Sequence, residues 1–438
     1  MSDFRKGTTI KLLNGDSVSI VSKIGEGGQG AVYRVKYNGR EYALKWYLDG
    51  YLKNLKPSYK NFYKNLAHNV EIGSPSSAFL WQKAIAITGQ QSNGFGYLMD
   101  LRPQQYEEFT KFIKAKVHFS NTKAVIRAAV NVVEAFQDLH RKGLSYQDLS
   151  PGNFFINPQN GDVLICDNDN VAPDGMNLGI GGTPGYMAPE VILGTDKPGT
   201  NTDLFSLSVI LFELLFLSHP LDGANCCKYP CLTQKVEREL YAEKPVFVMS
   251  PTDHSNAPVR NVHSNLINLW GVFPDYLHEA FTQAFEQGTK DPKWRLSEND
   301  WKKVLYRLLD TSEECPKCHE INFVETGKNQ IIQCSVCRKQ YALPYMITIG
   351  SQTVLASPQH QLLKYHTNHG SREEIVGTFV ESKKTPGVYG LKNESPLGWE
   401  VTYPGKEVMV YETGKVVTVI PGTTIKFGNV TMEIKESK

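Results

Sequence analysis

The sequence predicts an α+β fold in which a strand-then-helix domain is followed by a small metal-binding unit and an all-β sandwich. Strand-like segments fill residues 17–46, and helical periodicity begins at residue 122. Two Cys-x-x-Cys pairs then precede a strand-rich tail that begins near residue 345. A chain of 438 residues is long enough for about three such domains.

The composition is that of an ordinary globular protein, with 41% hydrophobic and 21% charged residues. Lys and Arg total 47 against 45 Asp and Glu, so a net charge of +2 gives no reason to expect nucleic acid or a membrane as partner. The first residues carry charges with no apolar segment behind them, and the most hydrophobic run, 204–217, is too short to span a bilayer. Eight cysteines are too few for a disulfide scaffold, so we expect a soluble, cytoplasmic protein.

The first strands flank a glycine-rich turn. Residues 17–20 alternate polar and apolar side chains, and segments 31–37 and 41–46 surround Asn38-Gly39, the signature of a tight hairpin. The next elements that we expect are a helix at 58–72 and a strand at 95–101.

The following part of this domain is helical. Val125, Ala129, Val132, Phe136 and Leu139 recur at helical spacing, before a glycine that stops the helix. Further helices are expected at 203–217, 274–288 and 297–309, and a loop with one short helix at 220–262.

Gly25, Gly27 and Gly30 fit the pattern G-x-G-x-x-G, which is weak evidence by itself. A dinucleotide fingerprint requires a helix after the glycines, but here a strand and a hairpin follow. A glycine turn between antiparallel strands lets backbone N–H groups approach nucleotide phosphates, and an ordinary glycine-rich hairpin is the alternative. Lys45 lies on the return strand in Tyr-Ala-Leu-Lys, which matches the V-A-I-K pattern whose lysine holds the α- and β-phosphates.

A third signal lies just beyond the long helix. Asp148 and Asn153 have the D-x-x-x-x-N spacing of a catalytic loop, in which the Asp orients the attacking hydroxyl and the Asn binds a metal. A hydrophobic strand at 163–166 then presents Asp167. The segments Gly-Thr-Pro-Gly-Tyr-Met-Ala-Pro-Glu at 182–190 and Asp-Leu-Phe-Ser at 203–206 follow.

Taken in this order, the motifs make residues 18–309 resemble the eukaryotic-type Ser/Thr protein kinase family. The resemblance implies a kinase domain over 1–310, with an N-lobe to residue 101 and a C-lobe from residue 102, that uses ATP and Mg²⁺ to phosphorylate protein substrates. Asp148 would be the catalytic base and Lys45 the phosphate anchor. The nucleotide-binding residues that it implies are Gly25, Gly27, Gly28, Gly30, Val32, Ala43, Lys45, Met99, Asp100, Leu101, Asn153 and Asp167.

The resemblance also implies more specific roles. Asn153 and Asp167 would be the Mg²⁺ ligands, and Met99 would be the gatekeeper before a hinge at 100–102. The residues with supporting roles would be Thr183, which contacts the catalytic loop, Glu190 with its partner Arg295, and Asp203, which braces the catalytic loop.

Several positions depart from the family pattern. Tyr146-Gln147 replaces His-Arg, so the arginine that reads activation-loop phosphate is missing. Ser150 stands where a lysine would neutralise the γ-phosphate. Asp-Asn-Asp at 167–169 replaces Asp-Phe-Gly, which makes Asp169 a second candidate metal ligand.

The helix that should supply an acidic partner for the anchoring lysine gives no clear candidate. Glu71 is the only acid in 58–72, and it lies about one turn too late. A nucleotide-binding pseudokinase scaffold is therefore the alternative to an active kinase, which the intact Asp148, Asn153 and Asp167 favour. Phosphotransfer to a small molecule is a third option, against which the 182–190 segment argues.

The paired cysteines have the C-x₂-C…C-x₂-C spacing of a zinc ribbon, which we predict at 311–343. Four thiolates would fill a tetrahedral Zn²⁺ site and leave no position for water, so the metal would be structural. His319 is not expected to be a ligand, and Cys226, Cys227 and Cys231 are expected to be loop and core thiols. The four zinc ligands would be Cys315, Cys318, Cys334 and Cys337.

The tail at 344–438 looks like the later strands of a forkhead-associated β-sandwich, on the evidence of segments 390–395, 399–401, 420–422 and 425–428. The Gly-Arg and Ser-x-x-His elements that grip phosphothreonine are not evident, so we expect a degenerate adaptor. This domain order resembles that of a kinase encoded in bacterial three-gene groups, beside a von Willebrand A-like protein and a metal-dependent Ser/Thr phosphatase. The resemblance implies these two proteins as partners.

Overall fold

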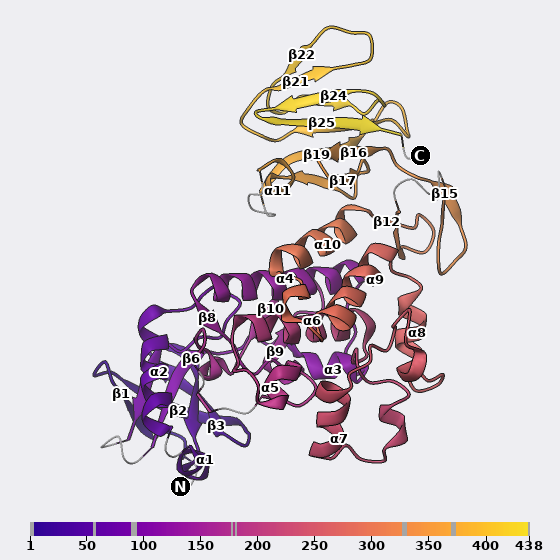
Figure 1. The fold of residues 1–438 in the computed structure, drawn as a ribbon. Coiled ribbons are helices and arrows are strands. Elements are labelled where there is room, and N and C mark those ends of the chain that lie inside the picture. Colours follow the sequence, from indigo (N-terminus) through magenta and orange to yellow (C-terminus); the bar gives the residue numbers. More distant parts are fainter. Residues whose placement is uncertain are drawn as a thin grey trace. The chain divides into compact units, whose positions relative to one another are not determined.

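The computed structural model describes residues 4–55, 58–88, 94–176, 178–179, 182–325, 331–368 and 374–436. Along the chain, strands come first, helices follow and strands return, which confirms the α+β class and the β-rich C-terminal region (Figure 1). Two compact units emerge: the first comprises Met1–Ser120, Arg127–Trp270 and Glu279–Lys302, and the second comprises Asn121–Ile126, Gly271–His278 and Lys303–Lys438.

The first unit begins with a closed barrel in the strand order β1-β2-β3-β4-β6-β5. Its strands are β1 (Thr9–Leu12), β2 (Ser17–Glu26), β3 (Gly30–Tyr37), β4 (Arg40–Tyr47), β5 (Ala84–Ile87) and β6 (Phe95–Asp100). Alternate side chains such as Val18, Val35 and Leu44 fill the barrel. Asn38 and Gly39 have φ values of 47° and 80°, both positive, as the predicted tight hairpin needs.

Helix α2 (Tyr59–Ile72) follows α1 (Asp49–Asn54) and packs against the barrel. Phe62 and Leu66 of α2 are buried in one cluster with Tyr47 of β4 and Phe95 of β6. The rings of Phe62 and Tyr47 lie 5.3 Å apart. Because residues two apart share one face of a strand, this helix lies on the side of β4 to which Lys45 also points.

The chain between the barrel and the cysteine pairs is mostly helical. Its elements are β7 (Glu107–Glu108), α3 (Phe109–Ile113), α4 (Thr122–Arg141), β8 (Leu144–Ser145), β9 (Phe154–Ile156), β10 (Val163–Ile165), β11 (Ala172–Pro173), α5 (Pro189–Leu193), α6 (Thr200–Phe216), α7 (Gln234–Arg238), α8 (Ser264–Trp270), α9 (Asp275–Thr282) and α10 (Glu298–Asp310). Helix α6 is buried along most of its length, which accounts for its apolar sequence. Across the described ranges, no helix has both the length and the apolar character that a membrane crossing requires.

The predicted loop at 220–262 contains more helix than expected. It holds α7, a π-helical turn at Glu239–Glu243, and short 3₁₀ turns at Cys226–Lys228 and His254–Asn256. Leu240 and Tyr241 of the π-helical turn are buried, so tertiary packing stabilises helical turns that the polar sequence alone did not predict.

The C-terminal strands form two hairpins and two sheets. The hairpins pair β12 (Ser312–Glu314) with β13 (Ile321–Phe323), and β14 (Ile331–Gln333) with β15 (Gln340–Ala342). The sheets have the orders β17-β16-β25-β24-β21-β22 and β18-β19-β20-β23. Their elements are β16 (Met346–Ile349), β17 (Gln352–Leu355), β18 (Gln361–Leu363), α11 (Lys364–Asn368), β19 (Ile375–Glu381), β20 (Tyr389–Asn393), β21 (Trp399–Thr402), β22 (Met409–Tyr411), β23 (Val416–Thr418), β24 (Thr424–Phe427) and β25 (Val430–Lys435).

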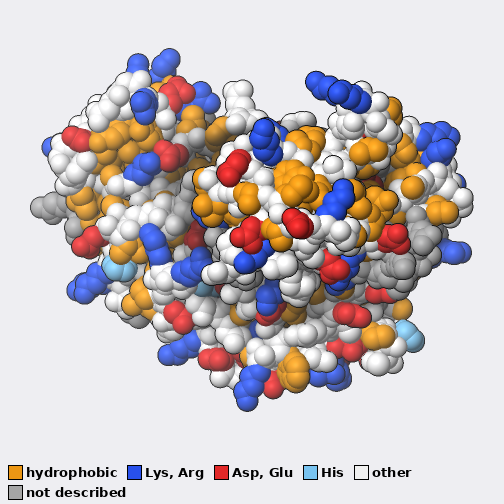
Figure 2. All heavy atoms as spheres, turned by 90° about the horizontal axis from the view of Figure 1, so that it is seen from above, with side chains coloured by type: hydrophobic (Ala, Val, Ile, Leu, Met, Phe, Trp, Pro, Cys, Tyr) orange, Lys and Arg blue, Asp and Glu red, His pale blue; other side chains and the backbone are white. Residues whose placement is uncertain are grey.

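The two sheets share one core. Ile347, Trp399 and Ile425 of the larger sheet are buried in the same cluster as Leu391 and Val417 of the smaller one. Such a shared core between two antiparallel sheets is the arrangement of a β-sandwich. On the face drawn in Figure 2, acidic and basic side chains are interspersed among hydrophobic groups, in agreement with the net charge of +2.

Candidate functional site

The glycine-rich turn joins β2 to β3, and the N–H of Gly27 donates to the carbonyl of Gly30 at 2.9 Å. A Cβ at Gly30 would lie 2.5 Å from the carbonyl oxygen of Trp46, so barrel packing alone requires glycine there. A Cβ at Gly25, Gly27 or Gly28 would meet nothing within 4 Å. Packing therefore does not explain why these three positions are glycine. The open space beside their backbone would let a phosphate group approach the N–H groups.

The side chain of Lys45 on β4 points toward three hydrogen-bond acceptors, Gln29, Asp167 and Asp169. We call these four residues the Lys45 cluster. Nζ of Lys45 lies 2.9 Å from Gln29 Oε1, 3.1 Å from Asp167 Oδ1 and 3.0 Å from Asp169 Oδ2. Burial alone would lower the pKa of Lys45, but the charges of Asp169 and Asp167 outweigh that effect and raise it. The cluster therefore holds a fixed cation beside the glycine-rich turn.

Asp148 and Asn153 lie on the loop between β8 and β9. Asp148 Oδ1 accepts hydrogen bonds from the backbone N–H and the hydroxyl of Thr183, at 3.0 and 2.9 Å. Burial raises the pKa of Asp148, and the bonds from Thr183 offset part of that rise. The amide nitrogen of Asn153 donates to the carbonyl of Asp148 at 2.9 Å, which leaves the amide oxygen as the atom that Asn153 can offer to a cation.

Asp167 follows β10 in a left-handed conformation, with φ of 53°. Its carboxylate side chain is 39% exposed, whereas that of Asp169 is fully buried. Of the two acids, only Asp167 presents its carboxylate to the side from which a ligand could arrive.

Asp203 on α6 organises the chain just before Asp148. Its Oδ2 accepts from the N–H of Tyr146 at 2.6 Å, and its Oδ1 accepts from the N–H of Gln147 at 3.1 Å. His140 Nε2 lies 3.2 Å from Oδ2. These contacts hold a backbone in which Gln147 has a positive φ of 69°, a conformation that is unfavourable for a residue with a side chain.

The contacts of His140 should make stability depend on pH. Burial alone would lower its pKa, but hydrogen bonds with Asp203 and Glu298 outweigh burial and raise the pKa to about 9. In the unfolded chain the pKa of His140 is about 6.5. The contribution of the charged ring to the free energy of unfolding is therefore complete below about pH 6.5 and is lost as the pH rises through about 9. From about pH 6 to about pH 10, the free energy of unfolding should fall by roughly 2–3 kcal/mol more in the wild type than in His140→Gln. Urea denaturation measures both, and an equal fall in the two proteins would contradict the assignment.

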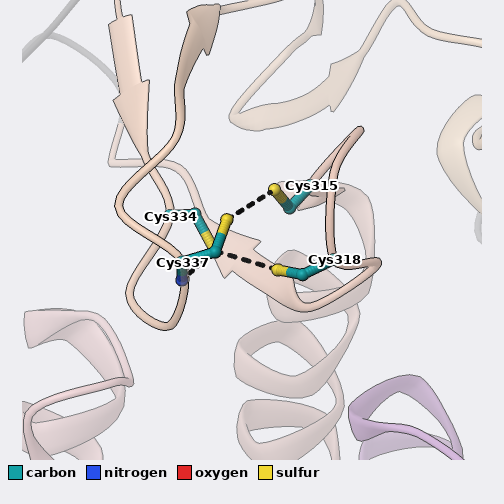
Figure 3. A group of neighbouring side chains, drawn as sticks. All are labelled: Cys315, Cys318, Cys334 and Cys337. Carbon is teal, nitrogen blue, oxygen red and sulfur yellow. Dashed lines mark hydrogen bonds between the residues drawn. The ribbon is translucent and has the colours of Figure 1, made fainter.

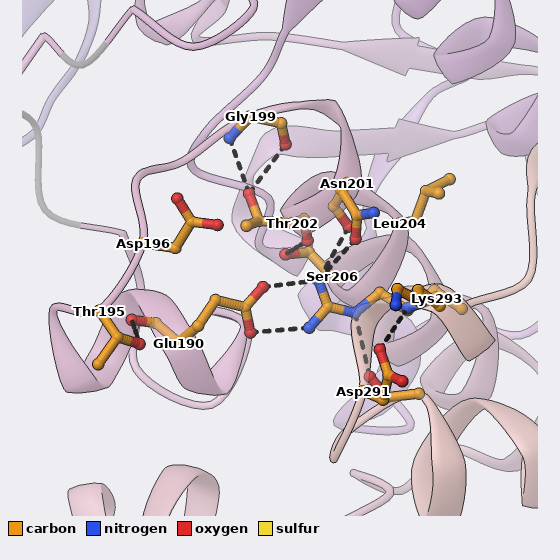
Figure 4. Close-up of polar contacts among 12 residues, drawn as sticks. Glu190, Thr195, Asp196, Gly199, Asn201, Thr202, Leu204, Ser206, Asp291 and Lys293 are labelled. Carbon is orange, nitrogen blue, oxygen red and sulfur yellow. Dashed lines mark hydrogen bonds and ion pairs between the residues drawn. The ribbon is translucent and has the colours of Figure 1, made fainter.

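Glu190 and Arg295 form a bidentate ion pair. Two guanidinium nitrogens of Arg295 donate to the two carboxylate oxygens of Glu190, at 2.7 and 2.8 Å. Figure 4 shows Glu190 with the dashed contacts of its carboxylate. Arg295 also donates to Asn201 on α6 and to the carbonyl of Gly288. These acceptors offset the free-energy cost of burying the charge of Arg295. The ion pair therefore holds the segment that begins at α5 in place.

The side chains expected around adenine form one apolar cluster. Val32 on β3 pairs with Lys45 on β4, two residues along that strand from Ala43, and Ala43 pairs with Met99 on β6. Asp100, the next residue, is exposed. Of the nucleotide-binding residues that the resemblance implies, this cluster contains Val32, Ala43, Met99 and Leu101, with Leu164 packed among them.

Sequence reasoning missed the acidic partner of Lys45. Glu71 is exposed at the end of α2 and takes no part in the Lys45 cluster. Asp169, which the sequence made a second candidate metal ligand, is buried, and its oxygens accept from Lys45 and from the hydroxyl of Tyr47. These bonds engage the carboxylate away from solvent.

The four paired cysteines converge on one point (Figure 3). Their sulfur atoms all lie within 4.8 Å of one another. Sγ of Cys315 is 3.6 Å from Sγ of Cys337, and Sγ of Cys318 is 3.5 Å from Sγ of Cys334. A tetrahedron of Zn–S bonds of about 2.3 Å has edges of roughly 3.8 Å, so this spacing fits a single zinc ion.

The two cysteine turns are built alike. His319 and Arg338, each directly after the second cysteine of a pair, have φ values of 62° and 59°. In both turns the first sulfur accepts a backbone N–H at 3.5 Å. Burial opposes ionisation of Cys334, but backbone N–H groups of its turn lower its pKa to about 6. The side chain of His319 is 75% exposed and contacts Glu314, so it lies outside the set of sulfurs.

The other cysteines do not form a comparable group. Cys226 donates to Asp222, and Cys227 and Cys231 are exposed. Among the residues that the structure describes, the four paired cysteines are the one group of three or more His, Cys, Asp or Glu side chains placed to hold a metal ion.

Comparison with known proteins matches residues 18–269 to the protein kinase domain model. The CBL-interacting serine/threonine-protein kinase 5 of Arabidopsis thaliana is 30% identical over 125 residues, which cover 27% of each chain. The cAMP-dependent protein kinase type 3 of Saccharomyces cerevisiae is 28% identical over 306 residues, which cover 68% of this chain and 69% of that one. The serine/threonine-protein kinase YPK3 of the same yeast is 31% identical over 136 residues, 28% of this chain and 25% of that one. The chain thus spans about a quarter of the length of two of these relatives and just over two thirds of the third.

Proposed function

Because the chain belongs to the protein kinase family, we propose that it is an ATP- and Mg²⁺-dependent Ser/Thr protein kinase. The observation that carries the proposal is the convergence of Lys45, Asp148, Asn153 and Asp167 beside a glycine-rich turn whose backbone is not covered by side chains. The two pairs are joined through the N–H of Cys166, next to Asp167, which donates to the carbonyl of Asn153 at 2.9 Å. Carboxylate and amide oxygens are the ligands that Mg²⁺ prefers, so Asn153 and Asp167 suit that ion. Mg²⁺ held there would offset the negative charge of the phosphates.

In this proposal each residue has a distinct task. The backbone of the glycine turn covers the phosphates, Lys45 anchors them, and the apolar cluster around Met99 receives adenine. Asp148 orients the hydroxyl of a Ser or Thr substrate and accepts its proton as the γ-phosphate moves to the oxygen. Thr183 keeps Asp148 Oδ1 occupied, whereas Oδ2 has one long contact, 3.4 Å from the amide nitrogen of Asn170, so Oδ2 would be the oxygen that takes the proton of the hydroxyl.

A nucleotide-binding scaffold without catalysis is the second candidate function. Ser150 at the usual lysine position favours it, because the γ-phosphate lacks one stabilising cation. Purified protein incubated with γ-labelled ATP, Mg²⁺ and a general protein substrate decides between the two. Transfer of label by the wild type, lost in Lys45→Met, supports the kinase; nucleotide binding without transfer supports the scaffold.

Activation should not require a phosphorylated loop. Gln147 Nε2 donates to the carbonyl of Met176 at 2.5 Å and supplies no positive charge for a phosphate. Phosphatase treatment of the purified protein should therefore change its activity by less than about twofold. A large loss of activity that disappears in Gln147→Ala would contradict this prediction.

We propose that the C-terminal region adds a structural zinc ribbon and an adaptor sandwich of the forkhead-associated type. The sulfur spacing of the four cysteines and the two-sheet core support these assignments. Because paired metal-binding cysteines suit a reducing compartment, we also propose a cytoplasmic location. From the domain order we propose a metal-dependent Ser/Thr phosphatase and a von Willebrand A-like protein as partners. Co-purification from the native cell, with the chain truncated after the kinase domain as control, tests the partners.

A further inference from the structure

The ammonium group of Lys45 has three N–H donors, and Gln29, Asp167 and Asp169 accept all of them. The three acceptors differ in how firmly they are held. Gln29 lies in the glycine-rich turn and Asp167 is 39% exposed, so both could yield to phosphate oxygens. Asp169 has no exposed side-chain surface. The bond from Lys45 to Asp169 is therefore closed to solvent and ligand, whereas its bonds to Gln29 and Asp167 can be exchanged for bonds to phosphate oxygens.

Asp169 is held from two strands of the barrel as well as by Lys45. Its Oδ2 accepts from the hydroxyl of Tyr47 on β4 at 2.6 Å, and its Oδ1 lies 3.4 Å from the hydroxyl of Tyr97 on β6. The preceding Asn168 donates to the carbonyls of Leu80 and Ile165, at 2.9 and 3.0 Å. The carboxylate is thus fixed by neighbours on both sides before any ligand binds.

Helix α2 does not offer an acid to Lys45. Its inward polar side chains are Asn65 and Asn69, and both donate to the carbonyl of Val171, at 2.7 and 2.9 Å. Glu71, the acid of this helix, is exposed. In kinases the ion pair between this lysine and a glutamate of the helix must be in place for transfer, so its position here is taken by another group.

We propose that Asp169 is the positioning residue that holds Lys45 for nucleotide binding, in the place that an acid of α2 would otherwise take. This inference rests on the proposed kinase function. The pair joins β4 to the segment after β10 and includes no residue of α2, so displacement of α2 does not separate it. The anchoring lysine is thereby made independent of the helix movement that controls such a pair elsewhere.

The test measures nucleotide affinity in full-length protein, by titration with a fluorescent ATP analogue and Mg²⁺, together with the rate of label transfer. Asp169→Asn keeps the shape of the side chain and removes its charge. It should weaken nucleotide binding by about tenfold or more, as expected for a lost charged hydrogen bond, and lower transfer as well. Glu71→Gln, the matched change on α2, should leave both unchanged.

A double-mutant cycle separates positioning from a general structural role. In a Lys45→Met background, Asp169→Asn should cost no further nucleotide affinity, because its effect acts through the lysine. Additive losses would overturn the proposal, as would wild-type affinity in Asp169→Asn. The concentration of Mg²⁺ needed for half-maximal transfer should rise in Asp167→Asn and not in Asp169→Asn; equal rises would overturn the proposal in favour of a metal ligand.

Tyr47→Phe provides a second route if Asp169→Asn does not fold, which its circular dichroism would reveal. It removes one hydrogen bond to Asp169 and leaves the charge pair, so it should weaken nucleotide binding by less than Asp169→Asn, and only when Lys45 is present. An equal loss in the Lys45→Met background would overturn the proposal. Failure of the wild type to bind nucleotide at all would instead refute the kinase function on which the proposal rests.

Discussion

Replacing Asp148 by alanine should lower phosphoryl transfer by about 10²–10⁴-fold, the usual loss when a general base is removed. The physical reason is local, because Asp148 accepts hydrogen bonds from Thr183 and lies outside the Lys45 cluster. Nucleotide affinity should accordingly stay close to that of the wild type. Initial rates of label transfer and titration with a fluorescent ATP analogue measure the two quantities separately.

Two further variants make this test sharper. Asp148→Asn can still accept from Thr183 but is a far weaker base, so it should be nearly as slow as Asp148→Ala. Asp162→Ala removes an exposed acid whose carboxylate accepts from nearby Asn160, and it should transfer phosphate at the wild-type rate. Melting temperatures exclude unfolding as the cause of any loss. Wild-type transfer by Asp148→Ala would show that the base has been assigned to the wrong residue.

The parts of the site that could be predicted from the sequence are those whose residues lie close together along the chain. Asp148 and Asn153 are close in sequence, and the structure joins them by a hydrogen bond within one loop. The tight hairpin at Asn38-Gly39 fixes where Lys45 falls on its strand, since the turn type sets the register of both strands. Each of these features could be read from a few consecutive residues.

The partner of Lys45 could not be read in that way. Asp169 lies 124 residues further along the chain, and only the tertiary fold brings the two side chains together. The expectation of a helical acid directed attention to 58–72, where Asn65 and Asn69 serve a different purpose. The polar character of Asp169 likewise suggested a metal ligand, because sequence does not reveal that Tyr47 and Tyr97 surround it.

Replacing Cys334 by serine should remove the metal and unfold the two cysteine hairpins while nucleotide binding persists. The hairpins have little apolar support of their own: the cluster beside them contains Val324 and Ile332 from the hairpins, with Met346 and Leu355 from the sandwich strands. Such a small core does not offset the entropy of ordering about 30 residues, so metal binding must contribute to folding. Structural zinc in small domains supplies about 10–16 kcal/mol, enough to decide whether the hairpins fold.

The expected results are one zinc per chain in wild-type protein purified without chelators, and markedly less in Cys334→Ser. Limited proteolysis should then cut the variant within 311–325 or 331–342, two segments that should resist cleavage in the wild type. Cys227→Ser, which alters an exposed cysteine of the kinase domain, is the matched control and should keep both metal and resistance. Because four thiolates would leave the ion no open position, the variant should still bind the fluorescent ATP analogue with wild-type affinity. Metal-free wild-type protein whose hairpins resist the protease would show that sulfur–metal bonds are not what holds them.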